Sequence, residues 1–138
     1  MVRFADIKKG MRIYDLGSGD GRLLFLSARM GAHSVGFEIN PFLVAYTYIR
    51  KVFLKEHSQI AVYWKNFWKA NIHKADVVFV YLLPWKMEKL EQKLLRELKP
   101  GSRVISNSFV FPHLELIQQD KTNHIYEFRI SKLPEKNI

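Results

Sequence analysis

The chain has no cysteine among its 138 residues. Disulfide bonds, thiol nucleophiles and cysteine-ligated metal sites are therefore excluded. It also lacks any apolar run near the roughly 18 residues that cross a bilayer, so we expect no transmembrane segment. Residues 1–5 lack the long apolar region of a signal peptide, which favours a cytoplasmic location. A chain of this length is expected to form one domain, residues 1–138.

Acidic residues are scarce. The 13 Asp and Glu face 22 Lys and Arg, which gives a formal net charge of +9. This balance favours an anionic partner such as nucleic acid, an anionic membrane surface or an acidic protein. A solvated basic surface without a partner is the simpler alternative. The five histidines lack the spacing of metal ligands, so we predict no metal site.

Three alternating glycines, Gly17, Gly19 and Gly21, follow a short apolar run at 12–16. The spacing differs from the dinucleotide fingerprint, because Arg22 stands where the third glycine should be. It is not a Walker A loop either, since no Gly-Lys-Ser/Thr follows. Glycines permit positive φ and close approach of a ligand, and the start of the following helix favours an anion. The sequence therefore predicts a nucleoside-binding turn.

The acids around this turn limit which nucleoside it holds. Asp15 and Asp20 would repel a pyrophosphate, which disfavours a nicotinamide-dependent oxidoreductase. S-adenosylmethionine fits better, because its carboxylate suits the turn and its ammonium and sulfonium suit Asp15. Glu38 ends a second apolar run, where an acid accepts the ribose hydroxyls. The alternative is that both aspartates cap a helix and Glu38 is a solvated strand end.

Apolar strand-like runs alternate with helical patterns, which indicates an α/β fold with a parallel sheet. The tail reads differently, as an antiparallel hairpin around residues 120–123. Only eleven residues precede the first predicted strand, and 108–114 leaves no room for a helix. The predicted strands are 12–16, 34–38, 61–65, 77–81, 103–108, 114–119 and 124–130, and the predicted helices are 22–30, 41–56 and 86–98.

The run Asp-Leu-Gly-Ser-Gly-Asp-Gly-Arg at 15–22 resembles the first motif of class I (seven-stranded) S-adenosylmethionine-dependent methyltransferases. Glu38 is similar to the acid that ends their second strand. Segments 33–41, 65–69 and 76–111 resemble a narrower group, the small non-SET protein lysine methyltransferases. That group includes enzymes acting on the adenine nucleotide translocase and on the c-ring protein of ATP synthase. The likeness covers about residues 8–111.

The resemblance implies a Rossmann-like class I methyltransferase fold, with a mostly parallel central sheet and a C-terminal antiparallel hairpin. The N-terminal helix of that plan, and the helix after strand five, are expected to be reduced or missing. This leaves apolar surface beside the first helix for a partner or a second copy. The implied cofactor is S-adenosyl-L-methionine, with Asn66 and Ile39 at its adenine. The implied cofactor-binding residues are Asp15, Gly17, Ser18, Gly19, Gly21, Glu38, Ile39, Asn66 and Phe67.

The predicted fourth strand ends at Tyr81, at the carboxyl edge where open α/β sheets bind ligands. With Pro84 and Trp85 it would form an aromatic mouth for a substrate lysine, Tyr81 positioning the amine. Nucleic-acid amino methyltransferases typically carry Asn/Asp-Pro-Pro-aromatic there, and this chain does not. The aromatics are equally readable as core or interface residues.

Three functions remain open from the sequence. The first is methyl transfer to a protein lysine. The second is a module that binds S-adenosylmethionine without turnover, because a complete N-terminal segment is missing. The third is an RNA or DNA methyltransferase, favoured by the net charge and by the basic-aromatic segment 64–74.

Overall fold

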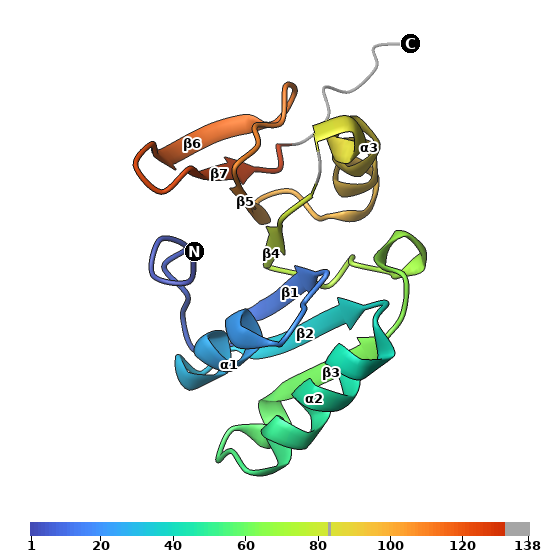
Figure 1. Cartoon of the computed structure of the whole chain (residues 1–138). Coiled ribbons are helices and arrows are strands. Elements are labelled where there is room, and N and C mark those ends of the chain that lie inside the picture. Colours follow the sequence, from blue (N-terminus) through green and yellow to red (C-terminus); the bar gives the residue numbers. More distant parts are fainter. Residues whose placement is uncertain (83, 132–138) are drawn as a thin grey trace.

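One seven-stranded sheet runs through the protein in the computed structural model, which describes residues 1–82 and 84–131 (Figure 1). Leu83 and residues 132–138 lie outside the described part. The strand order is β3-β2-β1-β4-β5-β7-β6. The strands are β1 (Arg12–Leu16), β2 (His33–Glu38), β3 (Ile60–Trp64), β4 (Val77–Val80), β5 (Arg103–Asn107), β6 (Glu115–Asp120) and β7 (Ile125–Arg129).

The pairing confirms the predicted fold class. Strands β1 to β5 pair in parallel, whereas β7 pairs antiparallel with both β5 and β6. Every residue of β4 is buried, as expected for a parallel strand covered on both faces. The hairpin has an irregular register between Leu116 and Gln118, which the sequence did not indicate. No helix in the described part of the chain is long and apolar enough to span a bilayer.

Helices cover both faces of the sheet. Helix α1 (Arg22–Arg29) and helix α2 (Pro41–Val52) lie over β1 to β3, as Figure 1 shows. Helix α3 (Met87–Glu97) packs Leu90 and Leu94 into the core on the other face. These apolar residues recur at the helical spacing that predicted α3 from the sequence.

The prediction that the second helix reaches residue 56 is wrong, because α2 ends at Val52. The chain turns there so that Leu54 packs against the buried Leu24 and Ile60. The Lys51 ammonium donates to the Ile60 carbonyl at 2.6 Å and holds the turn against β3. The start of the helix is as predicted, since the Asn40 side chain accepts a hydrogen bond from the Phe42 amide at 3.0 Å.

No α-helix occurs in residues 1–11, and none lies between β5 and β6, which confirms the expected reduction. Residues 1–7 instead form turns that bury Val2, Ala5 and Ile7 against the sheet. The Arg103 guanidinium donates to the Ala5 carbonyl at 2.6 Å and to the buried Glu127 at 2.7 Å. The N-terminal segment therefore covers part of the sheet face that a helix would otherwise cover.

Candidate active site

The turn between β1 and α1 has the backbone that its glycines predicted. Gly17, Gly19 and Gly21 have φ values of 84°, 57° and 81°, in the left-handed region that favours glycine. The amides of Gly17 and Ser18 donate to the Phe37 carbonyl at 2.9 and 3.0 Å. The turn is thereby fixed against the end of β2.

Glu38, the acid at the end of β2, is held by two backbone amides. One carboxylate oxygen accepts from the Gly19 amide and the other from the Asn40 amide, each at 3.1 Å. A carboxylate oxygen can accept more than one hydrogen bond, so both retain capacity for ligand hydroxyls. The predicted ribose acceptor is therefore oriented before any ligand binds.

Two glycines serve packing. A Cβ atom on Gly21 would lie 2.7 Å from Cγ2 of Thr47, so α2 approaches the turn only because this position is glycine. A Cβ atom on Gly36, in β2, would lie 2.6 Å from Leu24 and 2.7 Å from Oγ of Ser18. Sequence reasoning missed Gly36 because a glycine inside a strand has no motif, although it does indicate close approach of another chain segment.

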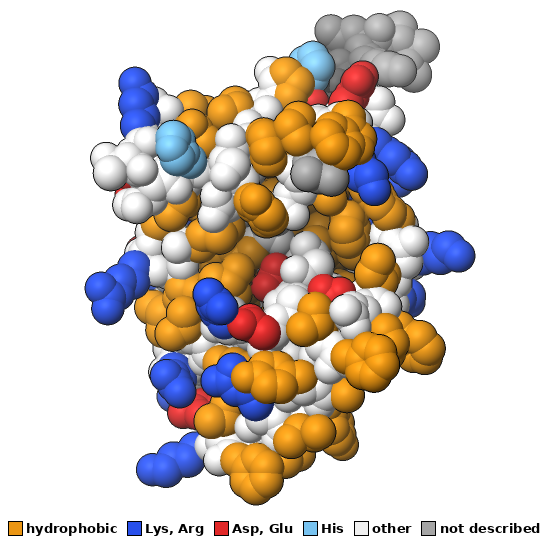
Figure 2. All heavy atoms as spheres, viewed as in Figure 1, with side chains coloured by type: hydrophobic (Ala, Val, Ile, Leu, Met, Phe, Trp, Pro, Cys, Tyr) orange, Lys and Arg blue, Asp and Glu red, His pale blue; other side chains and the backbone are white. Residues whose placement is uncertain are grey.

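Asp15 lies at the end of β1 and is 5% exposed. Burial, and then the negative charges of Glu38 and Asp20, raise the pKa of Asp15 to about 7. Figure 2 shows acidic side chains in and around the hollow at the centre of this face. A cationic group bound beside Asp15 would favour its ionised form and relieve the repulsion among the three acids.

Two cavities meet at Gly17 and Tyr81, the residues that follow β1 and β4. The first, of about 390 Å³, holds the buried Asp15. Asn107, at the end of β5, also lines it and was not predicted, because asparagine at a strand end carries no distinctive signal. The lining residues are Met1, Asp15, Gly17, Ser18, Asp20, Arg22, Leu23, Val80, Tyr81 and Asn107.

The second cavity, of about 420 Å³, lies on the Glu38 side of the turn. It brings together the predicted adenine residues Ile39, Asn66 and Phe67, with Trp68 beside them. Two lysines that were not predicted also line it. The complete lining is Leu16, Gly17, Phe37, Glu38, Ile39, Lys65, Asn66, Phe67, Trp68, Tyr81, Leu82 and Lys86.

Asn66 also shapes the loop that follows β3. Its side-chain oxygen accepts from the Trp68 amide at 3.0 Å and caps a short 3-10 turn, η2 (Phe67–Lys69). The Phe67 and Trp68 rings lie 4.6 Å apart between centroids. The Asn66 oxygen is thus engaged locally, and its amide nitrogen is the group available to an adenine ring.

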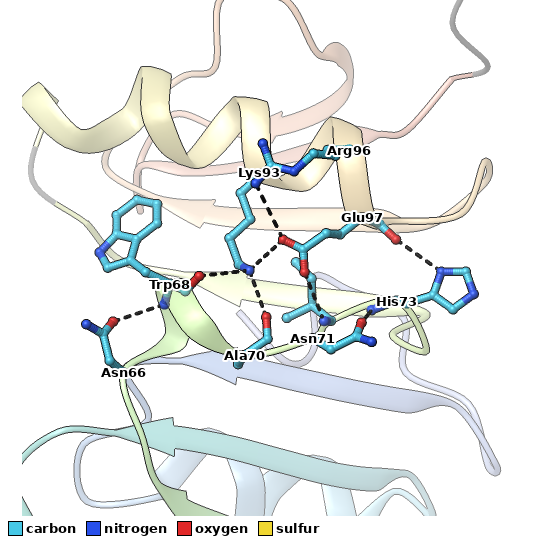
Figure 3. Close-up of polar contacts among 9 residues, drawn as sticks. Asn66, Trp68, Ala70, Asn71, His73, Lys93, Arg96 and Glu97 are labelled. Carbon is cyan, nitrogen blue, oxygen red and sulfur yellow. Dashed lines mark hydrogen bonds and ion pairs between the residues drawn. The ribbon is translucent and has the colours of Figure 1, made fainter.

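A buried lysine on α3 holds this loop in place (Figure 3). The Lys93 ammonium donates to the carbonyls of Ala70 and Trp68, at 2.7 and 3.4 Å, and to the Glu97 carboxylate at 2.5 Å. Glu97 accepts in turn from the Ile72 amide at 3.5 Å. Sequence reasoning missed this network, because a Lys and a Glu four residues apart usually form a solvated surface pair.

The predicted substrate residues are at the exposed mouth of the site. Tyr81 is exposed and lines both cavities where they meet. Pro84 and Trp85 form a 3-10 turn with Lys86, η3 (Pro84–Lys86), and are exposed. Lys86 reaches the second cavity, whereas Pro84 and Trp85 are not among the residues that line either cavity.

A larger hollow of about 620 Å³ lies at the opposite edge of the sheet. Asp76 there is bonded to the Arg12 amide and to Lys99, each at 2.8 Å, and Arg103 is bonded to Glu127. These charges are already paired, so the hollow has weaker claims as a site. Within residues 1–82 and 84–131, no three His, Asp or Glu side chains are grouped to hold a metal ion.

The glycine turn after β1, the acid that ends β2 and the reversed last strand together define a class I methyltransferase. The sequence pattern of the ANTKMT methyltransferase domain matches residues 15–118. The chain belongs to that family.

Several relatives carry names that describe their substrates. A human lysine N-methyltransferase, named for the c-ring protein of ATP synthase, is 36% identical over 113 residues, 82% of this chain and 48% of the relative. A protein-lysine N-methyltransferase of Saccharolobus islandicus (strain REY15A) is 36% identical over 79% of this chain and 69% of its own length. The mouse adenine nucleotide translocase lysine N-methyltransferase is 33% identical over 73% of this chain and 44% of its own. The chain thus spans about half the length of the mammalian relatives.

Solved structures give the same fold. An RNA methyltransferase from Salinibacter ruber, in complex with S-adenosyl-L-homocysteine, superposes with a TM-score of 0.87 at 31% identity. That match covers 98% of this chain and 91% of the other. A conserved hypothetical protein from Streptococcus pyogenes has a TM-score of 0.75 at 16% identity and covers 91% and 89%. At that identity, the second likeness concerns the fold alone.

Proposed function

We propose that this chain binds S-adenosyl-L-methionine and methylates the side-chain amine of a protein lysine. The observation that carries the proposal is the buried Asp15 carboxyl beside the glycine turn, in a cavity that meets the Glu38 cavity at Gly17 and Tyr81. A ligand with a cation at one end and a nucleoside at the other matches this order of groups.

The residues present fit this cofactor. The Ser18 hydroxyl is buried, lines the first cavity and has no hydrogen-bond partner in the structure, so it is available to a ligand carboxylate. Asp15 supplies the negative charge for an ammonium group. On the other side of the turn Glu38 presents its oriented oxygens to two ribose hydroxyls, and Ile39 offers an apolar contact to adenine.

When bound, S-adenosylmethionine supplies a methyl group already activated on a sulfonium. The chain's task is then to orient the groups and exclude water. The Gly17 turn and Glu38 fix the nucleoside, and Asp15 fixes the cationic end. Tyr81 stands where the cavities meet, and its hydroxyl is placed to accept a hydrogen bond from the incoming lysine amine.

Relatives support lysine as the acceptor, since those of human, mouse and Saccharolobus islandicus are named as lysine methyltransferases. Because the chain spans about half of the mammalian relatives, their particular substrates do not transfer directly. The proposal is therefore a protein lysine, with the exposed Tyr81 and Trp85 contacting the stem of its side chain.

An RNA substrate is the second candidate. It is favoured by the Salinibacter ruber neighbour and by the net charge of +9. Against it stands the sequence 81–85, Tyr-Leu-Leu-Pro-Trp, which lacks the amide or acid that begins the motif of base amino methyltransferases.

Label transfer tests the proposal. The chain is incubated with methyl-labelled S-adenosylmethionine and a cell extract, and label is counted in protein and in RNA separately. We expect labelled protein bands, with acid hydrolysis yielding methyl-lysine, and a large loss of label with Tyr81→Ala. The exposed Tyr48, outside the site, provides the control Tyr48→Ala.

Each result has a distinct meaning. Label confined to RNA would reject the lysine proposal in favour of the second candidate. Cofactor binding without label in any macromolecule would identify a module that binds and does not turn over.

A further inference from the structure

The solvent-facing side of α2 is apolar. Phe42, Tyr46, Ile49 and Phe53 recur at intervals of four, three and four residues, which places them on one stripe. Phe42 is 84% exposed and Phe53 is 83% exposed. Ala45, Tyr48 and Val52 widen the stripe and are also exposed. A surface helix normally turns this kind of face toward the core.

The fold explains why this stripe is not needed for packing. Within α2, Thr47 is the only buried residue, and it lies against Gly21 and Gly19 on the opposite side of the helix. Figure 2 shows hydrophobic side chains gathered over the region that α2 occupies in Figure 1. Exposed apolar patches of this extent mark interaction surfaces.

The charges around the stripe select the partner. Residues 39–55 contain Arg50, Lys51 and Lys55 and no acidic residue at all. Arg50 borders the stripe, with its guanidinium carbon 5.6 Å from the Tyr46 ring centroid, and the Lys51 ammonium is 5.5 Å from that of Tyr48. An apolar, aromatic-rich surface with a basic border is complementary to an anionic bilayer surface, where aromatic side chains reach the headgroup level.

A second copy of the chain fits less well. Each copy carries +9, and pairing α2 with α2 would bring two sets of Arg50 and Lys55 together. We propose that the α2 stripe, Phe42, Tyr46, Ile49 and Phe53 bordered by Arg50 and Lys55, docks the protein onto an anionic lipid surface.

Co-sedimentation with vesicles tests the proposal. One set contains only phosphatidylcholine, and the other contains about one third phosphatidylglycerol, at roughly 0.1 M salt. We expect the chain to pellet with the anionic vesicles and at least about tenfold less with the neutral ones. Phe42→Ser with Phe53→Ser should reduce binding at least about tenfold, because two large apolar contacts are lost.

Control variants keep the outcome interpretable. Val110 and Leu116 are exposed apolar residues outside α2, so Val110→Ser with Leu116→Ser should pellet like the parent chain. Lys55→Glu should weaken binding to anionic vesicles alone. Circular dichroism melting checks that every variant folds.

Two outcomes would overturn the proposal. One is equal pelleting of the parent chain and the Phe42→Ser, Phe53→Ser variant. The other is no binding to anionic vesicles, including the case in which ultracentrifugation shows a dimer that the same substitutions dissociate. A second copy would then occupy the stripe.

Discussion

At the scale of single residues, Glu38 is the group whose role is most directly measurable. Its two oxygens accept from the Gly19 and Asn40 amides, so it both shapes the turn and faces the second cavity. We expect Glu38→Ala to weaken S-adenosylmethionine binding by about 1–3 kcal/mol through lost ribose hydrogen bonds. Titration calorimetry measures this, with the exposed Glu115→Ala as control. Equal affinities of Glu38→Ala and the parent would show that Glu38 is only a strand end.

Asp15 predicts a dependence on pH. Its folded pKa of about 7 lies above the unfolded value of about 3.9, so the folded chain holds this proton more tightly. The stability that the group contributes is present in full below about pH 4 and is lost as pH rises through about 7. Over three pKa units this amounts to as much as about 4 kcal/mol.

Asp15→Asn should therefore stabilise the cofactor-free chain at pH 8 and change little at pH 4. The same substitution should weaken S-adenosylmethionine binding, because the partner of the cation is gone. Urea unfolding of both chains at the two pH values, with calorimetry at pH 8, measures the two effects. A variant less stable than the parent at pH 8 would contradict the assigned cause.

At the scale of elements, the glycine turn separates backbone strain from ligand contact. Gly19 has a φ of 57°, and a Cβ atom there would project into open space. Gly19→Val should cost stability and also abolish cofactor binding, by occupying the space that a ligand approaches. Gly101 is the matched control, because its φ is 90° and its Cβ would also meet nothing, far from the site. Gly101→Val should lose stability and keep its affinity; loss of affinity in both variants would refute the distinction.

The loop that contains Asn66 depends on α3 through Lys93. Lys93→Met should cost about 3 kcal/mol of unfolding free energy, because it leaves Glu97 and two carbonyls without their donor. Cofactor affinity should fall about tenfold as the loop loosens, which calorimetry on the folded variant measures. The exposed Arg96→Met on the same helix is the control. Unchanged affinity would mean that the loop keeps its shape without the lysine.

Elements with a strong local signal were predictable, and those fixed by distant contacts were not. The starts of α1 and α2 followed from Gly21 and from the Asn40 cap. The end of α2 depends on Leu54 meeting Leu24, which no local pattern encodes. In the site, the glycine turn and Glu38 had motifs, whereas Lys93 and Asn107 gained their roles only when the chain folded.

At the scale of the whole molecule, ligand binding should appear as stability. A ligand that binds only the folded state raises the unfolding free energy by about 2.7 kcal/mol at a concentration of 100 times its dissociation constant. We expect S-adenosylmethionine to raise the melting temperature and NAD to leave it unchanged. Thermal-shift measurements on the parent chain decide this, with Glu38→Ala as a variant that should respond less. A shift with NAD alone would point to an oxidoreductase.

The strand order also has a consequence for how the protein opens. Strands β3, β2 and β1 come from residues 12–64, whereas β4, β5, β7 and β6 come from residues 77–129, and the β1–β4 ladder joins these two halves of the sheet. Gly17 belongs to the first half and Tyr81 to the second, so a nucleoside lying between them would touch both. The concentration of such a metabolite would then set how often the halves separate, and a starved cell would hold a looser, more protease-sensitive pool of this protein.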